Sequence, residues 1–430
     1  MLSLSVVLGF IIWRFGPSIP FFNKPKSSGP ITITYWGLWE DENLIRPLIA
    51  EYQKQNPKIT INYERKSSLN YRTRVQTQVR EGVGPDVFRI HNSWLPMFAA
   101  DLAPAPADIF SPADYKSMFY PVASDSFMKG NAIYGAPTEI DGLALFYNED
   151  MLNGVGGKPP KNWQEFIDLA TKMTVKDATG IKTAGAALGT TGNVDHWSDI
   201  LGLLLFQQPG VDFSNFATPA VAEVLRFYTG FVTDPKKKTW DTNLPKSTDM
   251  FASGRLGFYI APSWRAHELR VTNPNLKFKV APMPQLSGRN VGWATFWGEV
   301  VSSKSKNIAE AWKFVKYLTS SEAEKLVYQE AAKVRLFGEP YSLTSLNGEL
   351  AGDPIVGAFV SQGPIYKFWY LSSNTFDNGI NDEMIKYFED GVNTTLAGTD
   401  PLSALQTVNQ GVEQVLDKYT KPVVSSPTPK

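Results

Sequence analysis

GNAIYGAPTEIDGLALFYNEDML, residues Gly130 to Leu152, is the stretch of sequence that decides the fold. Within it, Leu143 to Tyr147 is an apolar run with an aromatic end, which predicts a strand buried in an α/β sheet. Asn148-Glu149-Asp150 then predicts a turn. The segment PPKNWQEFIDLA that follows predicts a helix, because Asn162 precedes Glu165 by three residues in a capping-box pattern. The stretch therefore indicates a short strand, a turn, a crossing segment and a second strand.

Length and composition indicate a soluble protein with two lobes. A chain of 430 residues is too long for a single hydrophobic core. The 42 Lys and Arg residues balance the 42 Asp and Glu residues, and without a basic run the sequence gives no indication of a nucleic-acid partner. Cysteine is absent, which excludes disulfides, thiolate metal sites and a lipidated cysteine anchor. The three histidines, His91, His196 and His267, are widely spaced, so neither a metal site nor a cofactor is expected.

Strands and helices are expected to alternate along the chain. Such alternation is typical of right-handed βαβ units and of a mostly parallel sheet in each lobe. The expected strands are residues 32–36, 59–63, 86–90, 143–147, 257–261 and 300–302, and the expected helices are residues 41–55, 72–81, 220–233, 308–318, 382–388 and 401–419.

The two ends of the chain are expected to lie outside the folded body. Leu2 to Phe15 is nearly all apolar but short for a spanning helix, which needs about 20 residues. Residues 1–22 are therefore interpreted as a signal or anchor segment, with a buried apolar terminus as the alternative. Basic residues follow this run and none precedes it, which favours a natural start further upstream. Residues 23–30 are expected to be a linker and the proline-rich residues 421–430 a disordered tail.

Further blocks follow the opening stretch in a recognisable order. They are ITITYWGLWEDENLIRPLIAEYQKQNPKITINYE from Ile31, GVGPDVFRIHNSWLPMFAADLAPAPADIF from Gly82, FASGRLGFYIAPSW from Phe251 and VSSKSKNIAEAWKFVKYLTSSEAEK from Val301. With the Tyr-Gly-x-Pro and Tyr-Asn-x-Asp segments already quoted, this order resembles the extracytoplasmic solute-binding proteins of ABC importers, family 1, which are of the maltose- and oligosaccharide-binding type.

The resemblance implies a two-lobed periplasmic-binding-protein fold (type II), in which each lobe is a mostly parallel sheet flanked by helices. The ligand would lie in the cleft between the lobes, which close on it by hinge motion. The implied division is lobe 1 from residues 31–139 and 292–337 and lobe 2 from residues 140–291 and 338–420, with crossings near residues 138–142, 282–291 and 335–341.

The candidate ligand-binding residues combine aromatic rings with carboxylates, amides and a guanidinium. A sugar presents weakly apolar ring faces and a fan of hydroxyls, and in open α/β sheets the ligand lies beyond the carboxyl ends of the strands. The resemblance also favours Asp141, six residues before Tyr147, as a hydroxyl-binding carboxylate. The candidates are Trp36, Trp39, Glu40, Asn92, Trp94, Asp141, Trp197, Trp264, Arg265, Trp297 and Trp369.

Each candidate also has a structural interpretation. A tryptophan in a large α/β protein is more often part of the core than of a ligand site. Asp141 can cap a turn beside Gly142, Glu40 can stabilise a helix N-terminus, and Arg265 can form a surface ion pair.

Three functions remain open from the sequence. The first is a non-catalytic receptor, outside the cytoplasmic membrane and anchored to it by the N-terminal segment, that delivers a sugar to the permease subunits of an ABC importer as a monomer. The second is a carbohydrate-active enzyme using Glu139, Asp141 and Glu299. The third is a binder of another solute, such as a peptide or a polyamine. A polyamine ligand stays possible because Glu40, Asp41 and Glu42 form a run of carboxylates.

Overall fold

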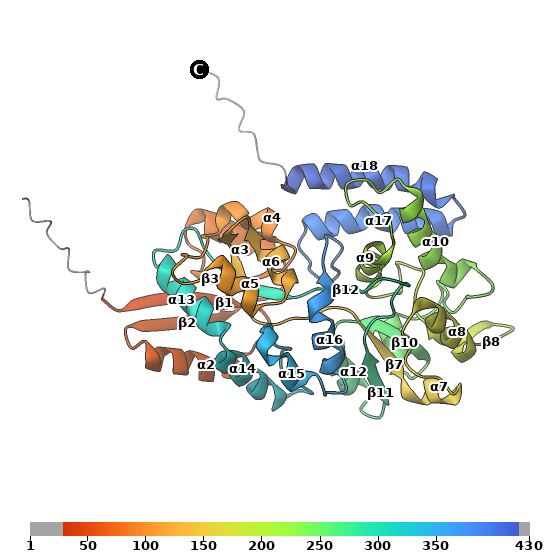
Figure 1. The fold of residues 1–430 in the computed structure, drawn as a ribbon, viewed down its shortest axis with the longest axis horizontal. Coiled ribbons are helices and arrows are strands. Elements are labelled where there is room, and N and C mark those ends of the chain that lie inside the picture. Colours follow the sequence, from red (N-terminus) through yellow and green to blue (C-terminus); the bar gives the residue numbers. More distant parts are fainter. Residues whose placement is uncertain (1–28, 421–430) are drawn as a thin grey trace, which may run out of the picture.

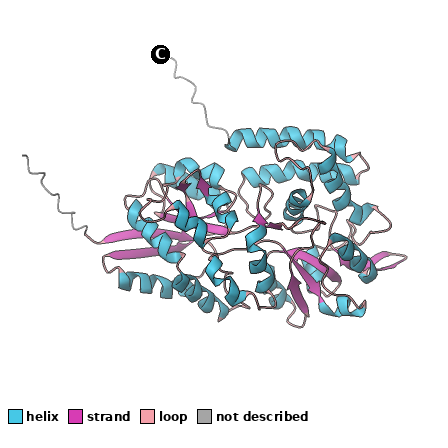
Figure 2. Ribbon diagram, viewed as in Figure 1, coloured by secondary structure: helices cyan, strands magenta, loops and turns pink. Residues whose placement is uncertain are grey.

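Two five-stranded sheets organise residues 29–420, which are the residues that the computed structural model describes (Figures 1 and 2). We call the two halves built on these sheets lobe 1 and lobe 2. In lobe 1 the strands β1, β2 and β3 are parallel, β13 runs antiparallel to β3, and β6 pairs antiparallel with β13. The order across the sheet is β2 (Ile59–Arg65), β1 (Ile31–Gly37), β3 (Val87–His91), β13 (Trp297–Val301) and β6 (Gly135–Pro137).

Local sequence signals explain the helices that flank the first sheet. The side chain of Asp41 accepts a hydrogen bond from Asn43 N and caps α2, while Gly82, with φ of +74°, ends α3 in the left-handed conformation that glycine adopts most readily. The helices and short elements of lobe 1 are α2 (Glu42–Gln55), α3 (Tyr71–Glu81), α4 (Leu95–Phe98), η1 (Ala99–Asp101), α5 (Pro112–Met118), α6 (Pro121–Phe127), β4 (Met128–Lys129), β5 (Ala132–Ile133), α13 (Ile308–Leu318) and α14 (Ser321–Ala332).

The sheet of lobe 2 is mostly antiparallel, so the expectation of a mostly parallel sheet in each lobe is wrong for this lobe. The apolar strand expected at residues 143–147 is β7, which pairs antiparallel with both β10 and β11, whereas β10 and β9 are parallel. The order is β11 (Phe278–Ala281), β7 (Ala144–Asn148), β10 (Leu256–Ala261), β9 (Gly180–Ala186) and β8 (Val175–Asp177), and the flanking helices are α7 (Glu149–Gly154), α8 (Trp163–Met173), α9 (Trp197–Gln207), α10 (Pro219–Thr233), α11 (Ser247–Ala252) and α12 (Arg265–Thr272).

One local expectation after β7 is wrong and the next is confirmed. The predicted turn at residues 148–150 is the start of helix α7, because the side chain of Asn148 accepts a hydrogen bond from Met151 N and caps it. Asn162 caps α8 as predicted, and Glu165 N donates to its side chain at 2.9 Å. The carboxylate of Glu165 accepts from Lys161 N, one residue earlier than a standard capping box requires.

The lobes are joined by paired crossing segments. After β6 the chain passes through residues 138–143 into β7, and it returns from lobe 2 through residues 292–296 into β13, slightly later than the expected 282–291. Leu143 N donates to Trp293 O at 2.9 Å, and Thr295 N donates to Asp141 O at 3.0 Å. Between these bonds a Cβ on Gly142 would lie 2.1 Å from the carbonyl oxygen of Trp293, so only glycine fits there.

The C-terminal part of the described chain bridges the molecule. A third segment meets the first crossing where Ile140 N donates to Pro340 O at 2.9 Å. Figure 1 shows the long helices α17 and α18 side by side along one side of the molecule, where they pack on α10 and where α18 also contacts α4. The elements of this part are β12 (Gly292–Trp293), η2 (Thr344–Leu346), α15 (Asn347–Leu350), α16 (Val356–Gln362), η3 (Gly363–Ile365), β14 (Tyr366–Lys367), α17 (Ile380–Leu396) and α18 (Pro401–Thr420).

The expectations for the chain ends lie outside the described residues. These are the signal or anchor segment at residues 1–22, most of the linker at residues 23–30 and the tail at residues 421–430. Within residues 29–420 no helix combines the length and the apolar character that a bilayer crossing requires.

Candidate functional site

The first part of the candidate site is an aromatic cluster at the edge of the lobe 1 sheet. Trp297 is the first residue of β13 and pairs in register with His91, the last residue of β3, so both lie at the carboxyl edge of the parallel strands. The ring of Trp39, beyond β1, is 46% exposed and meets Trp297 edge-on, with 5.8 Å between centroids. Trp94 lies buried behind Trp297 at 5.1 Å. The cluster therefore supports one exposed tryptophan face, that of Trp39.

The second part is an exposed tryptophan on lobe 2. Trp264 follows β10, is 42% exposed, and is the residue immediately before α12. The guanidinium carbon of Arg265 lies 4.3 Å from its ring centroid, and the ring of His196 lies 5.8 Å away, edge-on. Arg265 Nε also donates to His196 Nε2 at 3.0 Å, which fixes the imidazole and the guanidinium relative to each other. Trp264 is thus held by two polar side chains while much of its surface stays open.

A buried ion cluster lies beneath the lobe 1 edge. Arg89 Nη1 pairs with Glu40 Oε1 at 2.5 Å and Arg89 Nε with Glu299 Oε1 at 2.8 Å, and Tyr35 donates its hydroxyl to the same Glu299 oxygen at 3.0 Å. Burial raises the pKa of Glu299 in spite of the neighbouring Arg89, and the two carboxylates outweigh burial to raise the pKa of Arg89 well above its ordinary value. Glu299 is fully buried, so its carboxyl is an internal partner of Arg89 and Tyr35 and does not face a ligand.

Near the first crossing, buried Glu139 lies close to partly buried Glu339. Burial, followed by the neighbouring Glu339, raises the pKa of Glu139 well above its ordinary value. The pKa of Glu339 is lowered from its ordinary value. Burial acts to raise this pKa, but the charge of Arg335 and the hydrogen bond from Glu139 together have the larger effect. The carboxylate of Glu339 is paired with Arg335 Nη2 at 2.5 Å, so the pKa values of the two carboxyls shift in opposite directions.

Asp141 joins the first crossing to the segment that carries Trp264. Its carboxyl accepts hydrogen bonds from Gly142 N at 2.8 Å, from Ser263 N at 3.1 Å and from Ser263 Oγ at 2.9 Å. Burial raises the pKa of Asp141 to about 7, against the lowering effect of these hydrogen bonds. Asp141 thus positions the residue next to Trp264, and ligand contact by its carboxyl remains a prediction.

The other predicted residues are buried, except Trp369, which is partly buried. Trp36 is buried with Lys66 Nζ 4.0 Å above its ring, and Asn92 is buried with its Oδ1 accepting from Phe296 N. Trp197 is buried at the start of α9, and Trp369 packs among Phe213, Phe216 and Phe388. The structure brings Trp39, Trp94 and Trp297 together with Glu40 beneath the same edge, and Trp264 with Arg265, but places Trp197 and Trp369 in lobe 2 packing.

Sequence reasoning missed the loop between β14 and α17. Ser373 and Asn374 in this loop contact His196, and Phe376 is 59% exposed. A signal for this loop is present in the sequence: Asn374, Phe376 and Asn378 occupy alternate positions, so that an asparagine lies two residues before and two residues after the aromatic ring. Asparagine is one of the few residues that accept positive φ readily, so this spacing indicates an unusual backbone.

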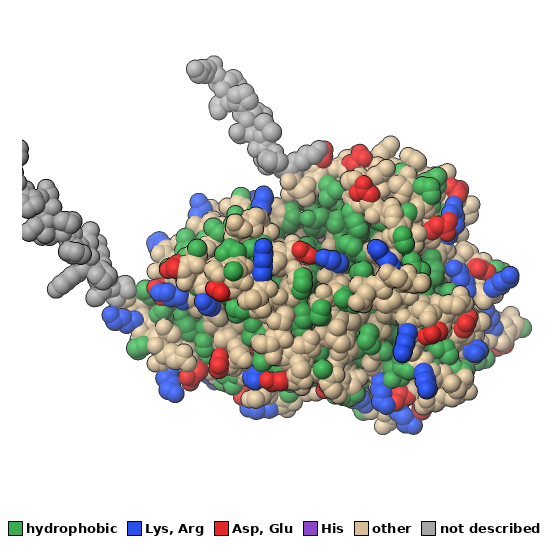
Figure 3. All heavy atoms as spheres, viewed as in Figure 1, with side chains coloured by type: hydrophobic (Ala, Val, Ile, Leu, Met, Phe, Trp, Pro, Cys, Tyr) green, Lys and Arg blue, Asp and Glu red, His purple; other side chains and the backbone are tan. Residues whose placement is uncertain are grey.

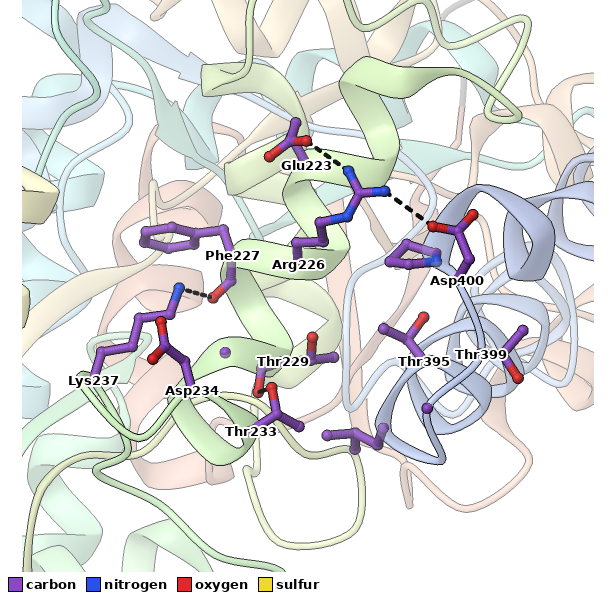
Figure 4. A pocket seen from close by; sticks show the side chains of 14 residues that line it. Glu223, Arg226, Phe227, Thr229, Thr233, Asp234, Lys237, Thr395, Thr399 and Asp400 are labelled. Carbon is purple, nitrogen blue, oxygen red and sulfur yellow. Dashed lines mark hydrogen bonds and ion pairs between the residues drawn. The ribbon is translucent and has the colours of Figure 1, made fainter.

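The described surface has depressions whose linings include neither Trp39 nor Trp264. A depression of about 600 Å³ lies between α10 and the α17–α18 junction, with Arg226 paired to Glu223 and Asp400 at its rim (Figure 4). Figure 3 shows basic and acidic side chains interspersed across the visible face, as the balanced charge predicts. Within residues 29–420 no group of three or more His, Asp or Glu side chains has a geometry that could hold a metal ion.

Comparisons with known proteins identify the family of this chain. Residues 38–325 match the family of bacterial extracellular solute-binding proteins, and the chain belongs to this family. A binding protein of Brucella abortus is 24% identical over 273 residues, which are 62% of this chain and 66% of the relative, just under two thirds of its length. The multiple sugar-binding protein of Streptococcus mutans is 22% identical, over 71% of this chain and 76% of the relative.

The fold likewise matches solved structures. The sugar-binding protein MalE from Xanthomonas citri superposes with a TM-score of 0.72 over 90% of this chain and 98% of that protein, at 22% identity. The two-lobed periplasmic-binding-protein fold expected from the sequence is thereby confirmed, and the family and these neighbours are solute-binding proteins rather than enzymes.

Proposed function

We propose that this protein is a receptor that binds a sugar or oligosaccharide between its two lobes and delivers it to an ABC importer. The observation that carries the proposal is the pair of exposed tryptophans, Trp39 on lobe 1 and Trp264 on lobe 2, each at a strand end and each supported from behind. The sugar-binding relatives support the same ligand class.

The chemistry of these surfaces suits a neutral carbohydrate. A tryptophan face that covers one sugar ring contributes on the order of 1 kcal/mol by buried area. Two such faces on separate lobes would make ligand binding stabilise the closed conformation, because only that conformation brings both faces to the ligand. The carboxyls of Glu40 and Glu299 are paired with Arg89 and that of Glu339 with Arg335, which makes them weaker partners for a polyamine than free carboxylates.

The cellular setting belongs to the same proposal. The receptor would act as a monomer outside the cytoplasmic membrane, with residues 1–22 as its anchor or signal and the permease subunits as its protein partners. The lobes would divide as residues 31–139 with 292–337 and residues 140–291 with 338–420. The membership in an extracellular family supports the compartment.

Catalysis on the carbohydrate is not proposed. A glycosidase needs two carboxyls that flank the scissile bond of a bound sugar. Glu299 is fully buried against Arg89 and Tyr35, and Glu139 is hydrogen-bonded to Glu339 below the surface. Asp141 is occupied by Ser263 and Gly142. We therefore expect binding without turnover.

The test is a tryptophan-fluorescence titration of the full chain against a sugar panel. The panel contains maltotetraose, mannotriose, diacetylchitobiose and tagatose, with spermidine and a short peptide as non-sugar controls. We expect a saturable change with at least one sugar, no consumption of that sugar, and a loss of affinity of about tenfold in Trp264→Ala. Val271→Ala, an exposed change on α12, is the matched control and should bind like the wild type.

Two results would contradict the proposal. A response only to spermidine or to the peptide would leave the fold assignment unchanged and would contradict the assignment of a carbohydrate ligand. Wild-type affinity in both Trp39→Ala and Trp264→Ala would move the site away from the two exposed tryptophans.

A further inference from the structure

Residues 372–378, SSNTFDN, form a strap that connects lobe 2 to lobe 1. At its first end Ser373 N donates to Asp199 Oδ2 at 3.1 Å, and Ser373 Oγ lies 3.0 Å from His196 Nδ1. His196 is the residue whose ring meets Trp264 edge-on. The strap therefore starts directly beside the lobe 2 tryptophan.

The other end of the strap is fastened to lobe 1. Arg72, on α3, donates from Nε to Asp377 O at 2.6 Å and from Nη2 to Asn378 O at 2.9 Å. Just beyond the strap, Asn381 Nδ2 donates to Ser93 Oγ at 2.7 Å, next to Trp94 in the lobe 1 aromatic cluster. Both ends thus lie close to the aromatic groups of the proposed sugar site.

Side chains of the strap alternate between buried and exposed. Thr375 and Asp377 are buried, and the carboxyl of Asp377 accepts hydrogen bonds from Gly379 N and Asn381 N at the start of α17. Asn374, Phe376 and Asn378 are exposed between them. The exposed row therefore consists of an aromatic ring flanked by two amides, the combination of groups that a sugar ring and its hydroxyls can engage.

The backbone of this row is strained at one residue only. Asn374, Phe376 and Asn378 have φ values of +58°, +48° and +45°. Asparagine tolerates the left-handed region, but a bulky residue such as phenylalanine is a genuine outlier there. Strain of this kind persists where the surrounding structure enforces it and concentrates at ligand clamps. Phe376 is thus held exposed, in an unfavourable conformation, by anchors on both sides.

Chain length limits where the ring of Phe376 can lie. Phe376 is three positions beyond Ser373, and an extended chain spans at most about 3.6 Å per residue, so the Cα of Phe376 lies within about 11 Å of the Cα of Ser373. It also directly precedes Asp377, which is bonded to lobe 1 through Arg72. These two limits keep Phe376 close both to His196, which contacts Trp264, and to Arg72 of lobe 1.

We propose that Phe376 is a third aromatic contact for the bound carbohydrate, with Asn374 and Asn378 as flanking hydroxyl partners. This inference rests on the proposed function and deepens it: the strap supplies a wall of the site that neither sheet provides. It also favours an oligosaccharide over a single sugar, because three aromatic faces exceed what one ring can cover.

The test replaces the ring while keeping the backbone conformation. In Phe376→Asn and Phe376→Gly the new residue accepts positive φ, so we expect an unfolding midpoint no lower than that of the wild type. Affinity of the full chain for the tightest-binding sugar among maltotetraose, mannotriose and diacetylchitobiose should fall about fivefold to tenfold in both variants. Phe376→Tyr keeps the ring and should retain affinity, and Leu69→Ala, another exposed apolar side chain on lobe 1, should change nothing.

The outcomes separate this inference from the function on which it rests. Wild-type affinity in Phe376→Asn and Phe376→Gly overturns the role of Phe376 and leaves the receptor intact. A loss in Phe376→Asn without a loss in Phe376→Gly assigns the effect to the new amide and also overturns it. A wild-type chain that binds none of the sugars overturns the proposed function, and this inference with it.

Discussion

Replacing Asp141 by asparagine should change how the stability of this protein depends on pH. Asp141 is only 7% exposed, and burial raises the pKa of its carboxyl from 3.8 to about 7. Asparagine has the same shape and stands in for the protonated acid. Its Oδ1 can accept from Gly142 N and Ser263 N, and its Nδ2 can donate to Ser263 Oγ, so each partner of Asp141 keeps one hydrogen bond.

The direction of the effect follows from proton binding. Between pH 4 and pH 7, approximately, the folded protein holds a proton on Asp141 that the unfolded chain has released. The contribution of this group to the free energy of unfolding is therefore greatest below the unfolded pKa of 3.8 and is lost as the pH rises through the folded pKa of about 7. At about 1.36 kcal/mol per pKa unit, the loss amounts to about 4 kcal/mol in total.

The assay is urea unfolding followed by tryptophan fluorescence, at closely spaced pH values from 4.5 to 8.5, approximately, for the wild type and Asp141→Asn. The free energy of unfolding of the variant, minus that of the wild type, should rise with pH up to neutrality and then level off. Other buried acids, such as Glu324 with a pKa raised by burial to about 8, occur in both proteins and cancel in this difference.

A matched control removes the same charge from the surface. Asp108 is exposed, so Asp108→Asn reports what the loss of one negative charge does without the change in burial. A difference between Asp141→Asn and the wild type that stays constant across the pH range would refute the reasoning, because it would mean that the carboxyl is ionised throughout in the folded protein.

Two further predictions concern the joints of the molecule. In Gly142→Ala the new Cβ must displace the carbonyl of Trp293, which pairs the two crossings, so we expect a loss of more than about 1 kcal/mol of unfolding free energy and weaker sugar binding; unchanged urea unfolding would contradict the close approach. Arg89→Met leaves two buried carboxylates without their cation and should lower the free energy of unfolding by about 3–5 kcal/mol. As the control, Arg80→Met removes an exposed arginine paired with Asp101 and should lower it by at most about 1 kcal/mol. Equal effects of the two changes would argue against a buried ion cluster.

The parts of the fold that local patterns determine could be predicted well. Helix α13 begins and ends at the predicted Ile308 and Leu318, and Gly82 ends α3 as expected, because apolar periodicity and capping residues act within a few positions of each other. Helix α17 was predicted only over residues 382–388 but extends over Ile380–Leu396. Its later half packs against α18 and α10, and a short sequence window contains no information about those partners.

The site was harder to predict because exposure depends on contacts between distant segments. Trp36 and Trp39 both follow the same strand signal, yet Trp36 is buried beneath Lys66 while Trp39 stands exposed on Trp297. The ion cluster joins Arg89 to Glu299, 210 positions away, through the register of β3 and β13. Residue type and spacing predicted a site at the carboxyl edge of the sheet, but only the pairing of strands decides which side chains remain open there.

Asp141 illustrates why loss of binding alone would not assign a ligand contact in this molecule. From the sequence, Asp141→Ala is expected to weaken binding at least about tenfold without lowering the melting temperature. The structure instead predicts a lower melting temperature, because alanine leaves Ser263 N and Gly142 N without their acceptor in a buried position. Ser263 precedes Trp264, so the same truncation would also displace the tryptophan. Asp141→Asn separates these effects, because it should melt no lower than the wild type at neutral pH. If it keeps its affinity, the carboxylate charge plays no part in sugar binding and the residue acts by positioning Trp264. If it melts no lower than the wild type but loses affinity, the carboxylate itself contacts the sugar.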